Sequence, residues 1–338
     1  MLNKSNSQIE KNIRKRTEEA RKTYTFQKNH NPKLPVKYWF QNPPEGLTLF
    51  IVFYTQACRW AKCLGCNLPS MVSSKPVSFH NIMRQIDFVF DYVMSYKQKI
   101  SLRKIILSNN GSILDENTFS TTSLIYFFAK MNIHCPNISV ISLESRPEYV
   151  DLEELEVLSR AIKEGQTPTQ LELAIGFEAY DEKIRNDIFM KGLNLEKFDA
   201  LVKLLSKYKV RLKTYFMQKP IPGMSEQEAI EDIKKAIDYI DNMANRYNVD
   251  INMHINPTYS AYGTQLEEEF LKGNFTPPLL ENVRKAVLHA ENKKLSVYIG
   301  LYDEGLSTPG GSFIREGDEE LVNKLEEFNR TQNYELIK

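Results

Sequence analysis

Residues 48–66 read Thr-Leu-Phe-Ile-Val-Phe-Tyr-Thr-Gln-Ala-Cys-Arg-Trp-Ala-Lys-Cys-Leu-Gly-Cys. The first half is apolar and rich in β-branched and aromatic residues, which predicts a buried strand over 48–56. The second half carries Cys58, Cys63 and Cys66 on a loop. Three closely spaced thiolates can ligate three irons of a [4Fe–4S] cluster and leave the fourth iron open to S-adenosylmethionine. A closed zinc site completed by His80 is the alternative.

Strand-like and helix-like stretches alternate after this loop, as is typical of a parallel sheet covered by helices. Strands are predicted over 48–56, 104–108, 138–144, 170–177, 210–217, 249–256 and 295–302. Helices are predicted over 78–98, 118–130, 151–163, 196–208, 225–247 and 279–292. These units are too few for a closed eight-fold barrel, so we expect an α/β fold with a partial (β/α)6-type barrel whose lumen takes a ligand.

Three regions are expected along the 338 residues. The barrel spans 47–302, an N-terminal helical or extended segment spans 1–46, and a C-terminal α/β extension spans 303–338. The N-terminal segment is rich in Lys and Arg, with helical character over 7–23. We interpret its charged residues as a solvated face. An RNA-touching arm is the alternative.

Composition limits the partners. Net charge is +1, with 44 basic and 43 acidic residues, so the chain lacks the basic excess that dominates affinity for a nucleic-acid backbone. Neither a long apolar run nor a signal-peptide pattern is present at the start of the chain. We therefore expect a cytoplasmic protein with no membrane partner, and the balanced charge favours a small molecule over a nucleic acid as its partner. Cys135, the one cysteine outside the loop, is expected to be a packed thiol.

Polar side chains line one face of the later strands. Successive residues of a strand point to opposite sides, so Asp250, Asn252, His254 and Asn256 share a face opposite four apolar residues. The preceding strands add Gln170, Glu172, Glu178, Arg211, Lys213 and Tyr215. An ordinary barrel core is filled by branched apolar residues, so this face needs water or a polar ligand.

The carboxyl ends of the strands carry further polar residues. Ser108-Asn109-Asn110-Gly111-Ser112 ends the second strand, Glu144 the third and Glu178 the fourth. Ligands bind at the carboxyl ends of parallel strands, and carboxylates are natural partners for ribose hydroxyls. Pairing of either glutamate with a neighbouring Arg or Lys is the alternative.

These motifs resemble the radical S-adenosylmethionine subunit of archaeosine synthase and its bacterial relatives, over residues 47 to about 290. The resemblance rests on the cysteine loop together with residues 111–116, 144–148, 174–178, 190–192, 219–220 and 256–258. It implies that Cys58, Cys63 and Cys66 hold the cluster. The cofactor contacts that it implies are Gly111 and Ser112 at the methionine amino group, Glu144 and Glu178 at the ribose, and Lys191 at the methionine carboxylate. Leu64-Gly65 and Asn67-Leu68-Pro69 depart from the usual pattern on the adenine side.

Among the bacterial relatives, the resemblance points to a queuine lyase, which would cleave queuine and leave 7-aminomethyl-7-deazaguanine. The expected partners are a queuine-like base and an electron donor such as a flavodoxin or ferredoxin. Proton transfer to the departing amine would fall to His254, Lys213 or Lys219. Base recognition and stacking would draw on Asp250, Asn252, Asn256, Tyr259, Tyr262, Tyr298, Asp303 and Glu304. A lyase acting on modified tRNA and a non-catalytic iron–sulfur or zinc protein that binds RNA are the alternatives.

Overall fold

The computed structural model describes residues 2–338, and the side chains of residues 7–338. It contains one eight-stranded sheet in which the strands follow in chain order. The strands are β1 (Lys37–Gln41), β2 (Thr48–Val52), β3 (Lys104–Ser108), β4 (Val140–Ser145), β5 (Gln170–Glu178), β6 (Arg211–Gln218), β7 (Ile251–Pro257) and β8 (Ser296–Ile299). Strands β2 to β8 are parallel. They correspond to the predicted strands, which confirms the α/β partial barrel.

Strand β1 is the one strand that the periodicity did not predict. It is short, and it pairs antiparallel with β2, with Trp39 opposite Phe50. The two rings are stacked at 4.2 Å. Tyr38 is exposed and the other four side chains are half-buried, so β1 lacks the period-two alternation that a periodicity analysis detects.

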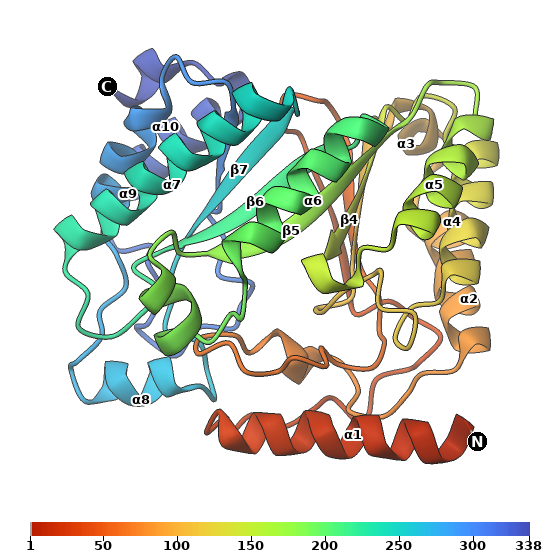
Figure 1. Ribbon diagram of the computed structural model, residues 1–338, viewed down its shortest axis with the longest axis horizontal. Coiled ribbons are helices and arrows are strands. Elements are labelled where there is room, and N and C mark those ends of the chain that lie inside the picture. The colour runs from red at the N-terminus through yellow and green to blue at the C-terminus, as the bar shows by residue number, and fades with distance from the viewer. Residues whose placement is uncertain (1) are drawn as a thin grey trace.

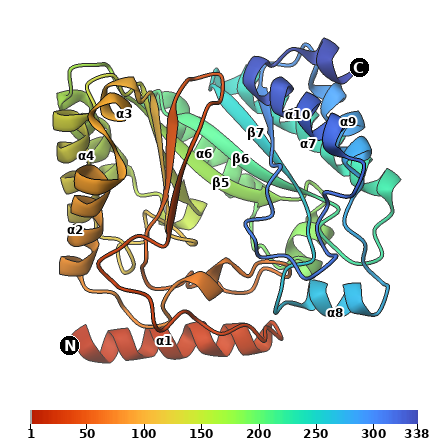
Figure 2. The same ribbon diagram turned by 180° about the vertical axis from the view of Figure 1, so that it is seen from behind.

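Helices cover the outer face of the curved sheet, as Figures 1 and 2 show. The longer ones are α2 (Phe79–Phe88), α4 (Thr121–His134), α5 (Leu152–Ala161), α6 (Leu195–Tyr208), α7 (Glu226–Tyr247), α9 (Leu280–Val287) and α10 (Glu319–Thr331); α3 (Tyr96–Ser101) and α8 (Gln265–Leu271) are short. Serine capping boxes begin α3 and α7, which satisfies amide groups that a helix start leaves unpaired. The helix predicted over 78–98 is therefore interrupted, because Ser95 begins a new helix.

The alternating pattern predicted for the strands is confirmed in β7. Ile251, Met253 and Ile255 are buried beneath the helices, whereas Asn252, His254 and Asn256 lie half-buried on the concave face. The concave face of the sheet is the barrel lumen. Cys135 is packed in the main core, as expected.

The N-terminal segment corrects one prediction. Helix α1 (Leu2–Glu19) lies across the carboxyl end of the sheet (Figures 1 and 2). Its inner face and the chain that follows are packed, with Ile13, Tyr24 and Phe26 in a small apolar cluster. Gly263 allows the close approach, since a Cβ there would lie 2.7 Å from the Tyr24 nitrogen. The solvated-face interpretation therefore holds only for the outer side of the helix.

In the part of the chain that the structure describes, no helix combines the length and the apolar character needed to cross a membrane.

Candidate active site

The cysteine loop follows β2 at the carboxyl end of the sheet, and backbone contacts hold it in place. Ala57 donates to the Ser73 carbonyl at 2.7 Å, and Leu64 donates to the Phe189 carbonyl at 2.9 Å. The Trp60 indole donates to the Met190 carbonyl at 2.8 Å. These bonds tie the loop to segments that follow β2 and β5, so its shape depends on distant parts of the chain.

All three loop cysteines are free thiols in this structure. Burial raises the pKa of Cys63, and burial followed by the neighbouring thiols raises the pKa of Cys66 to about 12. Among the described residues, no set of three or more His, Cys, Asp or Glu side chains is arranged as a metal-ion site. His80, the zinc ligand of the alternative interpretation, is exposed in the first turn of α2. Three thiols on one loop match the donors that a [4Fe–4S] cluster with one open iron requires.

Beside the cysteine loop, the end of β3 offers acceptors without partners. A Cβ at Gly111 would lie 3.3 Å from the Cys58 Cα, so the glycine allows the two loops to approach closely. Asn109 Oδ1 and Ser112 Oγ are buried and make no hydrogen bond. Buried polar atoms are normally paired, and these two can accept from an ammonium group such as the amino group of S-adenosylmethionine.

Glu178 and Lys191 form an ion pair at 2.7 Å. Burial alone would lower the pKa of Lys191, but Glu178 and then Cys63 raise it above its ordinary value. Gly176 makes room for the pair, because a Cβ there would lie 2.4 Å from Lys191 Nζ and 2.5 Å from Glu178 Oε1. The two residues expected to contact different parts of the cofactor are thus adjacent. A ligand that binds between the two side chains would meet the negative charge of Glu178 and the positive charge of Lys191.

Arg146, within the motif 144–148, supports this region, and the sequence alone predicted no role for it. Its guanidinium donates to the Lys191 carbonyl at 3.0 Å and lies 4.6 Å from the centroid of the Trp60 ring. It therefore joins the cysteine loop to the segment that carries Lys191. No local pattern reveals this contact, because its partners lie far from Arg146 in sequence.

The lumen contains two basic side chains between aromatic rings. Lys213 Nζ lies 5.7 Å and 5.5 Å from the rings of Tyr215 and Tyr298, and no carboxylate of the described residues lies within ion-pair distance of it. The His254 ring lies 5.0 Å and 4.8 Å from the same two rings. Both His254 nitrogens are buried without hydrogen-bond partners. Unpaired groups of this kind require a polar ligand or water.

The two basic groups differ in protonation. Burial, and then the nearby Lys104, lower the pKa of Lys213 to about 8, so its amine is still mostly protonated at neutral pH. Burial, followed by Lys213 and Lys104, lowers the pKa of His254 well below its ordinary value. Lys213 can therefore donate a proton, whereas neutral His254 offers one donor and one acceptor.

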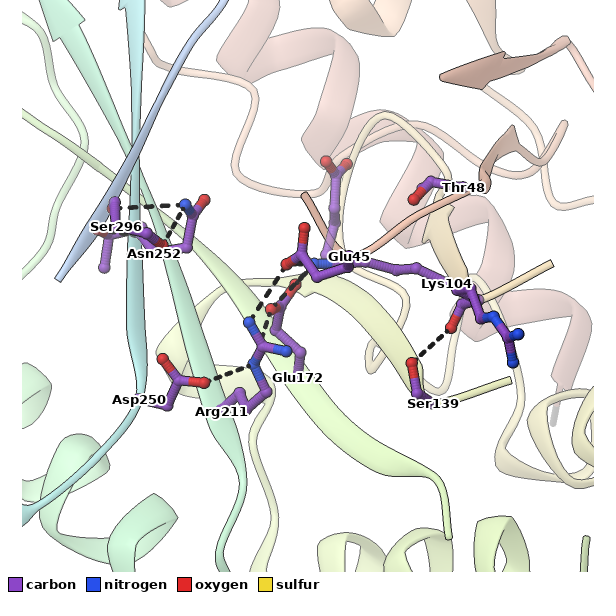
Figure 3. Close-up of polar contacts among 12 residues, drawn as sticks. Glu45, Thr48, Lys104, Ser139, Glu172, Arg211, Asp250, Asn252 and Ser296 are labelled. Atoms are coloured by element: carbon purple, nitrogen blue, oxygen red, sulfur yellow. Dashed lines mark hydrogen bonds and ion pairs between the residues drawn. The ribbon is translucent and has the colours of Figure 1, made fainter. Parts of the chain in front are cut away.

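Ion pairs close the amino end of the lumen (Figure 3). Lys104 contacts Glu172 at 2.9 Å and Glu45 at 3.3 Å, and Arg211 contacts Glu45 at 3.3 Å and Asp250 at 3.1 Å. Burial would raise the pKa of Glu172, but Lys104 and Lys213 hold it below its ordinary value. The expectation that Glu172 and Asp250 wait for a ligand is wrong, because both are paired within the protein.

Other predicted residues also have protein partners. Lys219 donates to Glu226 at 2.7 Å and to Thr276 at 3.0 Å, which removes it from the candidates for a free acid. Near the amino end of β7, Asn252 donates to Ser296 at 2.9 Å (Figure 3). Asp303 accepts from Ser307 at 2.8 Å. Tyr262 is 59% exposed, so it does not enclose a ring.

Near the carboxyl end of the lumen, the remaining predicted residues come together. Glu144 accepts from the Tyr215 hydroxyl at 2.6 Å. Burial and the charge of Glu144 raise the pKa of Glu304 to about 7, and burial followed by Glu304 raises the pKa of Tyr259. A Cβ at Gly300 would lie 2.4 Å from Asn256 Oδ1, so this glycine leaves space for the amide.

Known proteins of similar sequence include enzyme subunits from archaea. No family model matches the chain. Archaeosine synthase subunit beta from Methanosarcina acetivorans is 27% identical over 306 residues, which cover 86% of this chain and 81% of that protein. The protein of the same name from Thermococcus kodakarensis is 22% identical over 304 residues, 86% of this chain and 87% of that protein. The chain is thus similar to archaeosine synthase subunit beta over most of the length of both proteins.

The predicted resemblance to this subunit is thereby confirmed. Among solved structures, an archaeal Elp3 from Methanocaldococcus infernus, with an N-terminal deletion, has a TM-score of 0.44 and 17% identity. That match covers 65% of this chain and 51% of the Elp3 chain.

Proposed function

We propose that this protein is a carbon–nitrogen lyase that converts queuine to 7-aminomethyl-7-deazaguanine. The observation that carries the proposal is the unpaired polar floor of the lumen, where Lys213 and His254 lie between the rings of Tyr215 and Tyr298. Aromatic edges and unpaired hydrogen-bonding groups suit a planar heterocycle that carries hydroxyl and amine groups. The ion pairs of Lys104 and Arg211 at the amino end of the lumen limit the depth of the site.

The cofactor would occupy the carboxyl end of the sheet. We assign the cluster to Cys58, Cys63 and Cys66. Gly111 and Ser112 are assigned to the methionine amino group, Lys191 to its carboxylate, and Glu144 and Glu178 to the ribose. When bound, the cluster and S-adenosylmethionine supply a carbon radical that can take a hydrogen atom from the substrate. The protein residues orient the two molecules and keep water away.

Lys213 is our choice for the acid that protonates the departing amine. It is mostly protonated at neutral pH, its ammonium has no carboxylate partner among the described residues, and it faces the lumen. A positioned acid of this kind is worth about 10²–10⁴ in rate. His254, which is neutral, would hydrogen-bond the substrate, as would Asn256. Tyr259 and Glu304 would contact the substrate from the mouth of the lumen.

A free base is favoured over tRNA by the fate of the basic N-terminal residues. Arg16 donates to the Arg59 carbonyl at 2.5 Å, and Lys22 donates to the Cys66 carbonyl at 2.9 Å. Arg14 contacts Glu10 at 2.9 Å. These three charges are engaged within the protein, whereas Lys11, Lys15 and Arg21 are exposed, so about half of the basic residues of this segment face solvent. The second candidate is a lyase that acts on modified tRNA, favoured by the name shared by the two relatives, archaeosine synthase subunit beta.

Separate incubations with each candidate substrate distinguish the free-base lyase from the tRNA lyase. Reconstituted protein is incubated without oxygen, with S-adenosylmethionine and dithionite, and with either queuine or tRNA that contains queuosine. The proposal predicts 5′-deoxyadenosine and 7-aminomethyl-7-deazaguanine from queuine only. Stimulation of 5′-deoxyadenosine formation by the tRNA, and not by the free base, would overturn it and support the tRNA lyase.

A further inference from the structure

The N-terminal segment brings two polar groups to the cysteine loop that no motif assigns. Lys22 is 8% exposed and its ammonium donates to the Cys66 carbonyl at 2.9 Å. Tyr24 is 6% exposed, and its hydroxyl is buried without a hydrogen-bond partner. Both residues lie in the stretch directly after α1, which crosses the carboxyl end of the sheet (Figure 1).

Tyr24 lies near the cysteine loop, because Lys22 Nζ, which donates to the Cys66 carbonyl at 2.9 Å, lies 5.7 Å from the centroid of the Tyr24 ring. Burial raises the pKa of Tyr24, and the next contributions come from Cys66 and Cys58, followed after Thr17 by Cys63. The Thr17 hydroxyl is nearby, but it donates its own proton to the Ile13 carbonyl at 2.8 Å, and its contact with Tyr24 lacks hydrogen-bond geometry. The buried phenol therefore has no hydrogen-bond acceptor among the residues that the structure describes. An unpaired buried hydroxyl is costly unless a ligand satisfies it.

The segment is fixed in this position by contacts on both sides of Tyr24. Thr23 donates to the Gly263 carbonyl at 3.0 Å, and Gln27 donates to the Val72 carbonyl at 3.1 Å. Gln265 donates to the Ala20 carbonyl at 3.2 Å. The approach of Lys22 and Tyr24 to the loop is thus set by the fold, and does not depend on the two side chains alone.

We propose that Lys22 and Tyr24 are positioning residues of the iron–sulfur site, which stabilise the reduced cluster by a positive charge and by a hydrogen bond to sulfur. The inference rests on the cluster assigned to the cysteine loop and is independent of the substrate. Cluster potentials depend on net charge, on hydrogen bonds to the sulfurs and on solvent exposure. One-electron reduction adds negative charge, so a nearby ammonium and a hydroxyl donor favour the reduced form.

The test uses Lys22→Met, which keeps the aliphatic stem, and Tyr24→Phe, which removes only the hydroxyl. Lys15→Met and Tyr92→Phe are matched controls, because Lys15 lies on the exposed side of α1 and Tyr92 is 78% exposed. Each full-length protein is reconstituted, its iron and sulfide are measured, and its midpoint potential is determined by dithionite titration followed by electron paramagnetic resonance. Chelator-driven loss of iron is timed in parallel.

Lys22→Met should shift the redox equilibrium about tenfold toward the oxidised cluster, which is about 59 mV lower for one electron. Tyr24→Phe should shift it about threefold in the same direction, and both should lose iron faster than the controls. Fully loaded variants with unchanged potentials and unchanged iron loss would overturn the inference. If Lys22→Met fails to fold, the conservative Tyr24→Phe decides. If the parent protein binds no cluster, the cluster assignment is refuted. If the cluster-loaded parent protein does not convert queuine, only the proposed substrate is refuted.

Discussion

The pair Glu178–Lys191 allows a quantitative test of the proposed cofactor site. The two groups are 2.7 Å apart, and their side chains are 13% and 9% exposed. Removing one partner of a fully buried ion pair costs about 3–5 kcal/mol because it leaves the other charge uncompensated. Some solvent access reduces this, so we expect Lys191→Met to lower the free energy of unfolding by about 3 kcal/mol. Adding Glu178→Gln to Lys191→Met should restore part of that loss.

The assay combines urea unfolding of four proteins: the parent, both single variants and the double variant. The coupling free energy between the two positions should be about 2 kcal/mol, within the range found for contacting residues. Arg160→Met is the control, because the Arg160–Glu156 pair is exposed on both sides; it should cost about 1 kcal/mol or less. Additivity of the Glu178 and Lys191 variants would refute the reasoning about the buried pair.

The same variants test the ligand. Each removes a charge-assisted partner, worth about 1–3 kcal/mol, so S-adenosylmethionine should bind roughly tenfold to a hundredfold more weakly. Calorimetric titration of reconstituted protein measures this. Affinities unchanged in both single variants would show that neither residue contacts the cofactor, even if the stability result stands.

Four further outcomes are expected. Replacing any one of the three loop cysteines by Ala should abolish S-adenosylmethionine cleavage, measured as 5′-deoxyadenosine, and leave the circular dichroism spectrum unchanged; a variant that still cleaves would contradict the ligand assignment. Gly176→Ala should weaken S-adenosylmethionine binding, because its Cβ would displace the Glu178–Lys191 pair, which lies within 2.5 Å of it. If protonated Lys213 is the acid, turnover should fall as pH rises through about 8, and Lys213→Arg should move that limb to higher pH; an unmoved limb would assign the acid elsewhere. Lys219→Met should leave queuine turnover within about twofold, since its ammonium is paired with Glu226 and its loss acts on stability.

The pH dependence of stability has a defined sign for Lys213. Its pKa in the folded protein is about 8, against 10.5 ordinarily, so between these values the unfolded chain binds more protons than the folded one. Stability from this group is therefore fully present above pH 10.5 and is lost as pH falls through about 8. Urea unfolding of the parent and of Lys213→Met between pH 7 and 10 should differ in slope in this direction.

Local sequence patterns determined the parallel strands, the helices that cover them and the cysteine loop. Period-two alternation assigns Asn252, His254 and Asn256 to one face of β7 without any tertiary information, because the pleat of a strand dictates it. Ligand spacing in the loop likewise depends on residues close in sequence. The resemblance that these motifs predicted agrees with the similarity of the chain to two archaeal proteins named archaeosine synthase subunit beta.

Tertiary structure alone decided which polar residues remain unpaired. Glu172 and His254 share the lumen face, yet Lys104 neutralises Glu172 whereas His254 has no hydrogen-bond partner. The partners come from elements far apart in the chain, so no local pattern contains them. Tertiary structure also decided the environment of Lys22 and Tyr24. The charged residues of their segment predict a solvent-exposed helix and a polar stretch after it. Its place beside the cysteines follows from packing against loops nearly fifty and more than two hundred residues away, and long-range packing is a property of the folded chain.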